Sequence, residues 1–120
     1  MTSFYKFKPE VTLNDLENAN PKLLIVLGYF GLFCQEHTLP CLITSLFTDA
    51  VKIRSSSTHR DGRAFDASIR GFTDEDIKML VEYMEDKVGS LGAISLSDNI
   101  RRVVICHGGT ARHLHFQVSP

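Results

Sequence analysis

The sequence predicts an α+β domain, with a small, mostly antiparallel sheet and helices packed on one face of it. Two segments, one before residue 40 and one after residue 73, carry apolar residues at helical spacing. Other segments alternate polar and apolar residues with the period of a β-strand. The two kinds of segment do not alternate strictly along the chain, which favours α+β over a parallel α/β sheet. A length of 120 residues leaves room for a single domain, 1–120.

Both predicted helices have start signals. Asn20 supplies a capping side chain and Pro21 takes the first helical position of the first helix. Thr73 and Asp76 form a capping-box pattern at the start of the second. The chain before Asn20 is expected to be irregular or partly helical. The predicted helices span about 21–36 and 73–87.

Four segments are predicted as strands. One places Asp66 on its polar face, and the last places His113, His115 and Gln117 on one face with apolar residues on the other. These strands span 41–47, 63–70, 102–106 and 113–118, and the predicted loops include 48–62 and the HGG segment at 107–109.

The strand pattern suggests a metal site. If the second and fourth strands are neighbours, Asp66 and His115 point the same way, with Cβ atoms about 5 Å apart. His59 stands in the loop before the first of these strands and can fold back over the same face, helped by the backbone freedom of Gly62. Two imidazoles and one carboxylate suit Zn²⁺ and leave a fourth position for water, as in catalytic zinc sites. Amide hydrolysis is a chemistry that such a site supports.

The segment around His59 carries a specific motif. Residues 57–66 read STHRDGRAFD and fit SxHxxGxAxD at every fixed position, and HLH follows in the last strand. The motif resembles the D-Ala-D-Ala metallopeptidase family, which includes zinc D-alanyl-D-alanine carboxypeptidases and dipeptidases, phage L-alanyl-D-glutamate endolysins, murein endopeptidases and the amino-terminal domain of Hedgehog. The resemblance runs from about Cys41 to the end and implies a Hedgehog-like, DD-peptidase-like fold. It implies Zn²⁺ as cofactor and His59, Asp66 and His115 as its ligands.

The resemblance also bears on proton transfer. His113 looks like the second active-site histidine of the HxH members. His107 is a further candidate catalytic residue, if its loop overhangs the site, or else a turn residue. Many members carry a carboxylate as general base three residues before the last ligand, and here Arg112 stands there.

Basic residues near the motif are candidates for substrate binding. Arg60 and Arg63 flank the predicted metal loop and can hold a substrate carboxylate bidentately, or they are solvated surface charge. Many family members carry a substrate-binding arginine after the strand that corresponds to 41–47, and the nearest here is Arg54. The substrate-binding candidates are Arg54, Arg60, Arg63 and Ser57.

The activity implied by the resemblance is hydrolysis of an amide bond in peptidoglycan peptides by a zinc metallopeptidase, as in phage-type endolysins or murein endopeptidases. The L-alanyl–D-glutamate bond is the first choice of scissile bond and a D-Ala-containing cross-link the second. The alternative is a catalytically inactive, zinc-containing binding domain of the same fold, and Arg112 is the residue that favours it.

Bulk properties argue against other classes. A net charge of −1 gives no general attraction to nucleic acid, and the most apolar stretch, 23–34, is too short to span a bilayer. Three cysteines without CxxC spacing, and a start without an apolar signal core, fit synthesis in the cytoplasm. A bacteriophage lysis enzyme would then reach the cell wall through a holin or act as a virion component. We expect a monomer whose partners are peptidoglycan stem or cross-link peptides.

Overall fold

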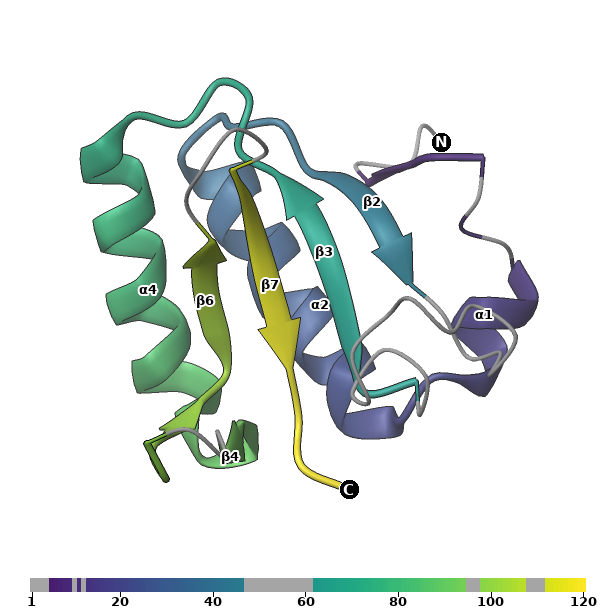
Figure 1. The fold of residues 1–120 in the computed structure, drawn as a ribbon. Coiled ribbons are helices and arrows are strands. Elements are labelled where there is room, and N and C mark those ends of the chain that lie inside the picture. The colour runs from purple at the N-terminus through teal and green to yellow at the C-terminus, as the bar shows by residue number, and fades with distance from the viewer. Residues whose placement is uncertain (1–4, 10, 12, 47–61, 95–97, 108–111) are drawn as a thin grey trace.

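The computed structural model of the chain describes residues 5–9, 11, 13–46, 62–94, 98–107 and 112–120. Over these residues it shows an α+β fold, in which helices pack against a five-stranded sheet (Figure 1). The helical elements are α1 (Leu13–Asn18), α2 (Pro21–Glu36), α4 (Asp74–Val88) and the short 3-10 helix η1 (Gly89–Leu91). The strands are β1 (Lys6–Phe7), β2 (Leu42–Leu46), β3 (Ala64–Ser68), β4 (Ala93–Ile94), β5 (Arg101–Arg102), β6 (Val104–His107) and β7 (His113–Gln117).

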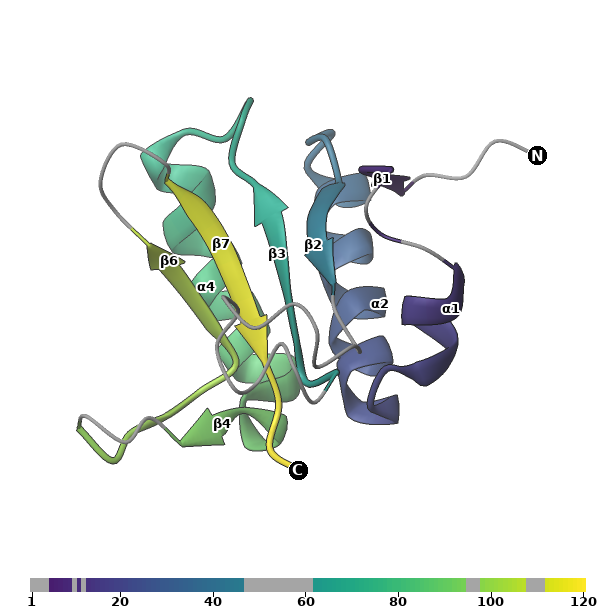
Figure 2. The ribbon, with the colours of Figure 1, turned by 45° about the vertical axis from the view of Figure 1, so that its right-hand side comes forward.

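The main sheet has the strand order β1-β2-β3-β7-β6, and β4 pairs with β5 in a separate small sheet. Helices α2 and α4 lie on the same face of the main sheet (Figures 1 and 2). The α+β class is therefore confirmed. The expected mostly antiparallel sheet is corrected to a mixed one, because β1 joins β2 in parallel while the other three pairings are antiparallel. Within the described ranges, no helix has the length and hydropathy needed to cross a bilayer.

The two predicted helices begin at the predicted caps. The Asn20 side chain accepts a hydrogen bond of 2.9 Å from the backbone N–H of Lys22. Thr73 and Asp76 form the reciprocal capping box, with bonds of 2.9 and 3.1 Å. The backbone N–H of Thr73 donates to the Asp76 carboxylate, and this bond, together with the adjacent Thr73 hydroxyl, lowers the pKa of Asp76. Local sequence signals therefore determine where both helices start.

The predicted strand 102–106 is wrong in one respect, because it divides at Val103. Residues before this point form β5 and pair with β4, and residues after it form β6 and pair with β7. The Val103 backbone is engaged elsewhere: its N–H donates to the Glu85 carboxylate at 3.2 Å, and its carbonyl accepts from the N–H of Gln117 at 2.9 Å. These two bonds interrupt the ladder and turn the chain out of the main sheet.

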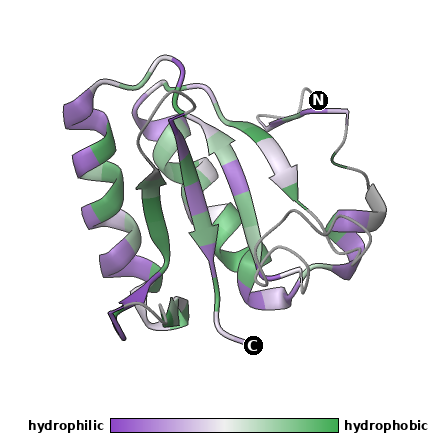
Figure 3. Cartoon of the chain, viewed as in Figure 1, coloured by the Kyte–Doolittle hydropathy of each residue, from purple (hydrophilic) through white to green (hydrophobic). Residues whose placement is uncertain are grey.

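The core lies between the sheet and its helices. Phe65 and Phe116 stack across β3 and β7 with ring centroids 4.6 Å apart, and Phe30 of α2 lies 4.7 Å from Phe116. All three are at most 1% exposed. Figure 3 shows the matching pattern on α4, whose hydrophobic residues face the sheet and whose hydrophilic residues face outward. Burial of these faces fixes which side of each strand is left for polar residues.

The aromatic cluster leads to a stability prediction. Phe30→Ala is expected to lower the free energy of unfolding by about 3–5 kcal/mol, because it removes a fully buried ring and leaves a cavity. Urea denaturation measures the loss. Leu32→Ala is the matched control, since Leu32 lies on the same helix and is 50% exposed. Equal losses in the two variants would contradict the packing described above.

Candidate metal centre

Asp66 and His115 meet on the face of the sheet opposite the helices. They are register partners in the antiparallel pairing of β3 with β7. His115 Nδ1 lies 2.9 Å from Asp66 Oδ1, and the two side chains are 9% and 19% exposed. The prediction that these strands are neighbours and that the two side chains share a face is confirmed.

Gly62 leads into β3 with a φ of +69°, in the left-handed region. Side chains with a Cβ are strained there, so glycine suits this position of the motif. Its carbonyl accepts a 2.9 Å hydrogen bond from the N–H of Asn20, which ties the turn to the start of α2. Gly62 thus adopts a backbone conformation that glycine reaches without strain, as expected.

A β-bulge in β2 adds polar residues to the same face. The register shifts between Ile43 and Ser45, and Ser45 is the partner of Asp66. Ile43 and Leu46 are buried in the core, whereas Thr44 and Ser45 are half-buried. The extra residue of the bulge lets both hydroxyl side chains avoid the core.

His113 lies beside the pair. Its Nε2 is 3.9 Å from Asp66 Oδ2, within ion-pair distance but beyond a direct hydrogen bond, and its side chain is 34% exposed. The two oxygens of Asp66 therefore face two different imidazoles. His107, expected in the loop, is instead the last residue of β6, and its backbone is the register partner of His113.

Four of the predicted site residues, namely the ligand His59 and the substrate-binding candidates Arg54, Arg60 and Ser57, lie outside the described residues. Their roles stay predictions. In the described ranges, no group of three or more His, Cys, Asp and Glu side chains is placed to hold a metal ion. The predicted ligand set needs His59, so only two of its three members fall within those ranges.

Arg63 lies at the opposite end of β7 from His113. Its Nη1 donates to the carbonyl of Val118 at 3.0 Å, and the N–H of Val118 donates to the carbonyl of Arg63 at 2.9 Å. The side chain thus takes part in holding the end of the chain against β3. Its predicted contact with substrate stays a prediction.

Arg112 is directed away from the Asp66–His115 pair. Its guanidinium is 3.6 Å from the carboxylate of Asp74, in the first turn of α4, and 3.9 Å from Cys106 Sγ. The Arg112 cation is therefore paired near the start of α4.

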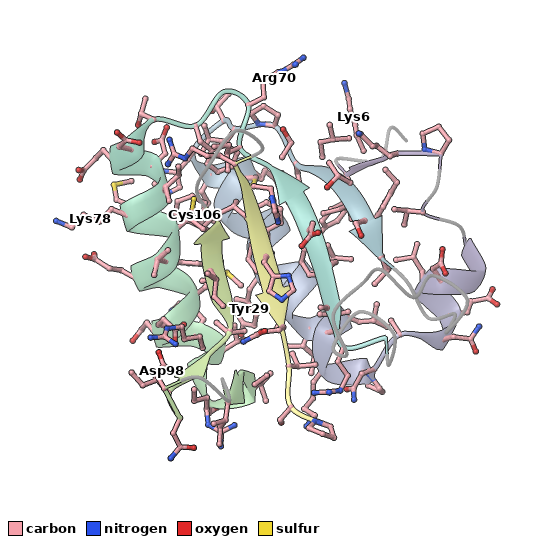
Figure 4. All side chains as sticks on the ribbon, viewed as in Figure 1. Lys6, Tyr29, Arg70, Lys78, Asp98 and Cys106 are labelled. Carbon is pink, nitrogen blue, oxygen red and sulfur yellow. The ribbon has the colours of Figure 1, made fainter. Side chains whose placement is uncertain are left out.

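Cys106 also lies on the helix side. It is the register partner of Leu114, which is fully buried in the core. Figure 4 labels Cys106 on β6, next to α4. Cys106 therefore lies on the opposite side of the sheet from His115.

Gln117 is the site residue whose role the sequence did not reveal. It is 8% exposed, and its Oε1 lies 3.1 Å from His115 Nε2. Its Nε2 donates to the carbonyl of Arg102 at 3.2 Å. Strand alternation predicts that Gln117 shares a face with His115, but the carbonyl that orients its amide comes from a distant segment.

The contacts of Gln117 indicate which ring nitrogen of His115 donates a hydrogen bond. Because the amide N–H₂ of Gln117 donates to Arg102, its oxygen faces His115, and His115 Nε2 must be the donor. A neutral ring with its proton on Nε2 would then point the Nδ1 lone pair at the Asp66 carboxylate, 2.9 Å away. A positive centre shared by the two atoms, either a proton or a metal ion, makes this contact favourable.

The pair fits Zn²⁺ in donor chemistry and in approximate spacing. Zinc takes imidazole nitrogen and carboxylate oxygen at about 2.0–2.2 Å, which places neighbouring tetrahedral ligand atoms about 3.4 Å apart. The observed 2.9 Å between Nδ1 and Oδ1 needs a separation of roughly half an ångström to admit the ion. Side-chain rotations on two fixed strands can supply a change of this size.

Comparisons with known protein families, with curated proteins and with solved structures find no match for this chain.

The ligand assignment leads to a binding prediction. The purified protein is expected to hold about one zinc ion per chain, and His115→Ala or Asp66→Ala to lose it, since each removes one of only three protein ligands. Elemental analysis after dialysis measures the stoichiometry. His37→Ala is the matched control, because His37 stacks on Phe33 at the end of α2 and is no part of the site. Full zinc content in His115→Ala would rule out the assignment.

Proposed function

We propose that this chain is a zinc metallopeptidase that hydrolyses an amide bond in peptidoglycan stem or cross-link peptides. His59, Asp66 and His115 would hold the ion. The observation that carries the proposal is the Asp66–His115 pair, with Nδ1 and Oδ1 2.9 Å apart. Asp66 is the last residue of the SxHxxGxAxD motif. The resemblance of that motif to the D-Ala-D-Ala metallopeptidases supports the substrate class.

Zinc held by three protein ligands supplies a Lewis acid and a water molecule of lowered pKa. The residues of this chain would determine where the ion lies. Asp66 and His115 sit on paired strands whose opposite faces are locked in the core by Phe65 and Phe116, so their spacing varies little. The substrate-binding candidates Arg54, Arg60, Arg63 and Ser57 would then meet the carboxylates of the stem peptide.

His113 is the proposed proton-transfer residue. Arg112 is paired with Asp74, so the position that carries the general base in many family members offers no carboxylate here. The His113 ring lies beside Asp66 and is one-third exposed, which allows it to exchange protons with both the site and solvent. It can accept a proton from the attacking water and deliver one to the leaving amine.

A catalytically inactive, zinc-containing binding domain is the second candidate. Arg112 in place of a carboxylate is the observation that favours it. Such a domain would bind the same peptides and leave them uncut.

The test incubates zinc-loaded protein with isolated sacculi and identifies the released peptides by mass. Cleavage at one bond type supports the peptidase and names the bond. Asp66→Ala, expected to lack zinc, is the matched negative control, and a chelator should abolish activity of the wild type. Zinc-dependent binding to sacculi without release of peptides would favour the binding domain.

The role of His113 leads to a kinetic prediction. His113→Ala is expected to keep its zinc but to lose at least about a hundredfold in kcat, because a positioned acid–base group typically contributes about 10²–10⁴. Steady-state rates on purified peptidoglycan fragments measure the loss, and zinc content is measured in the same samples.

His37→Ala serves as the control for this experiment, since it removes a histidine remote from the site. Near wild-type kcat in His113→Ala would mean that another group transfers the proton, and His107 would be the next residue to substitute.

A further inference from the structure

We propose that Gln117 is a positioning residue: it fixes the tautomer of His115 so that Nε2 carries the proton and Nδ1 faces the metal. This inference rests on the proposed function, because it assumes that His115 binds zinc. It adds to that function a residue outside the ligand set and a reason why one particular ring nitrogen serves as ligand.

The first observation is that the two ring nitrogens of His115 face different partners. Nδ1 lies 2.9 Å from Oδ1 of Asp66, the other predicted ligand within the described residues, and Nε2 lies 3.1 Å from Oε1 of Gln117. One edge of the ring therefore faces the predicted metal position and the other faces an uncharged amide. Ligand histidines in metalloproteins commonly donate their second N–H to an acceptor of this kind, which sets tautomer and ring orientation.

The second observation is that the Gln117 amide has one favourable orientation. Its Nε2 donates to the carbonyl of Arg102 at 3.2 Å. A flipped amide would place its oxygen against that carbonyl oxygen and its N–H₂ against His115. Only the observed orientation satisfies both neighbours when His115 is a metal ligand through Nδ1.

The third observation is that the Arg102 carbonyl is itself held in place. Arg102 pairs with Ala93 in the small β4–β5 sheet, and its guanidinium lies 2.8 Å from the Asp98 carboxylate. The backbone N–H of Gln117 donates to the next carbonyl, that of Val103. The bend between β5 and β6 therefore supplies two consecutive carbonyls, one to the backbone and one to the side chain of Gln117.

Burial increases the effect of losing either of these hydrogen bonds. His115 and Gln117 are both buried, so water does not readily replace an acceptor that is removed. Without the amide oxygen, the neutral ring can place its proton on either nitrogen. The tautomer protonated on Nδ1 cannot bind zinc through that atom, and the ring is also released from one of its orienting contacts.

The test compares zinc affinity in Gln117→Leu, Gln117→Glu and the wild type, measured by competition with a chelator. Gln117→Leu removes the acceptor at similar volume and is expected to weaken zinc binding by about 10–100-fold. Gln117→Glu keeps an oxygen for the Nε2 proton but loses the donor to Arg102. It is expected to keep wild-type affinity or exceed it, because a carboxylate raises the basicity of the ligand.

A second measurement follows the tautomer directly. In zinc-loaded, nitrogen-15-labelled wild type, the ring nitrogens of His115 should appear as a protonated Nε2 and a metal-bound Nδ1. Gln117→Leu should lose this pattern. Val104→Ala is the stability control: Val104 is buried in β6 and pairs with Phe116 on the core side, so it weakens the fold without touching the ring.

The outcomes separate this inference from the proposed function. Wild-type affinity and an unchanged tautomer in Gln117→Leu, with zinc still lost in His115→Ala, would overturn the role of Gln117 and leave the metal site standing. If Val104→Ala and Gln117→Glu lose as much zinc affinity as Gln117→Leu does, Gln117 is only a general stabilising residue. That result would overturn the inference. A wild type that binds no zinc would overturn both.

Discussion

The antiparallel pairing of β3 with β7 is the contact on which both the core and the candidate site depend. On the helix side, it stacks Phe65 on Phe116 with ring centroids 4.6 Å apart. On the other side, the same register brings Asp66 opposite His115. A slip of one residue would send the aromatic rings to the polar face and separate the carboxylate from the imidazole. Burial of the aromatic rings therefore also specifies the geometry of the polar pair.

The two predicted ligands on strands are placed by the main sheet. Asp66 and His115 lie on two paired strands whose other face packs in the core, and precise sites need rigid support of this kind. His59 is three residues before Gly62, where the chain adopts a left-handed turn that is bonded to the start of α2.

The contacts around His115 extend beyond the main sheet. The ring contacts Gln117, the amide of Gln117 contacts the carbonyl of Arg102, and Arg102 is held by β4 and by Asp98. The break at Val103 is what makes that carbonyl accessible to a side chain. The break between β5 and β6 therefore supplies the carbonyl groups that hold Gln117 beside His115.

Local patterns in the sequence determined much of the fold. The caps at Asn20 and Thr73 placed the starts of both long helices, because capping is a bond between residues two or three positions apart. Alternation placed Asp66 and His115 on polar faces, because neighbouring strand residues point to opposite sides. The lead-in before Asn20 is partly helical, as expected, because it contains α1. The strand β1 was not predicted, because a strand of two residues carries no periodic signal.

Only the tertiary structure decided which polar residues meet. The pairing of β3 with β7, the bulge at Thr44 and Ser45 and the bend at Val103 arise from contacts between segments far apart in the chain. For this reason Gln117 could be assigned to a face but not to a role, since its amide is oriented by a carbonyl 15 residues away. Arg112 likewise could be placed before the last strand, but its pairing with Asp74 depends on how α4 packs against β6. Sequence patterns describe one strand or helix at a time, whereas a site is made where several of them come together.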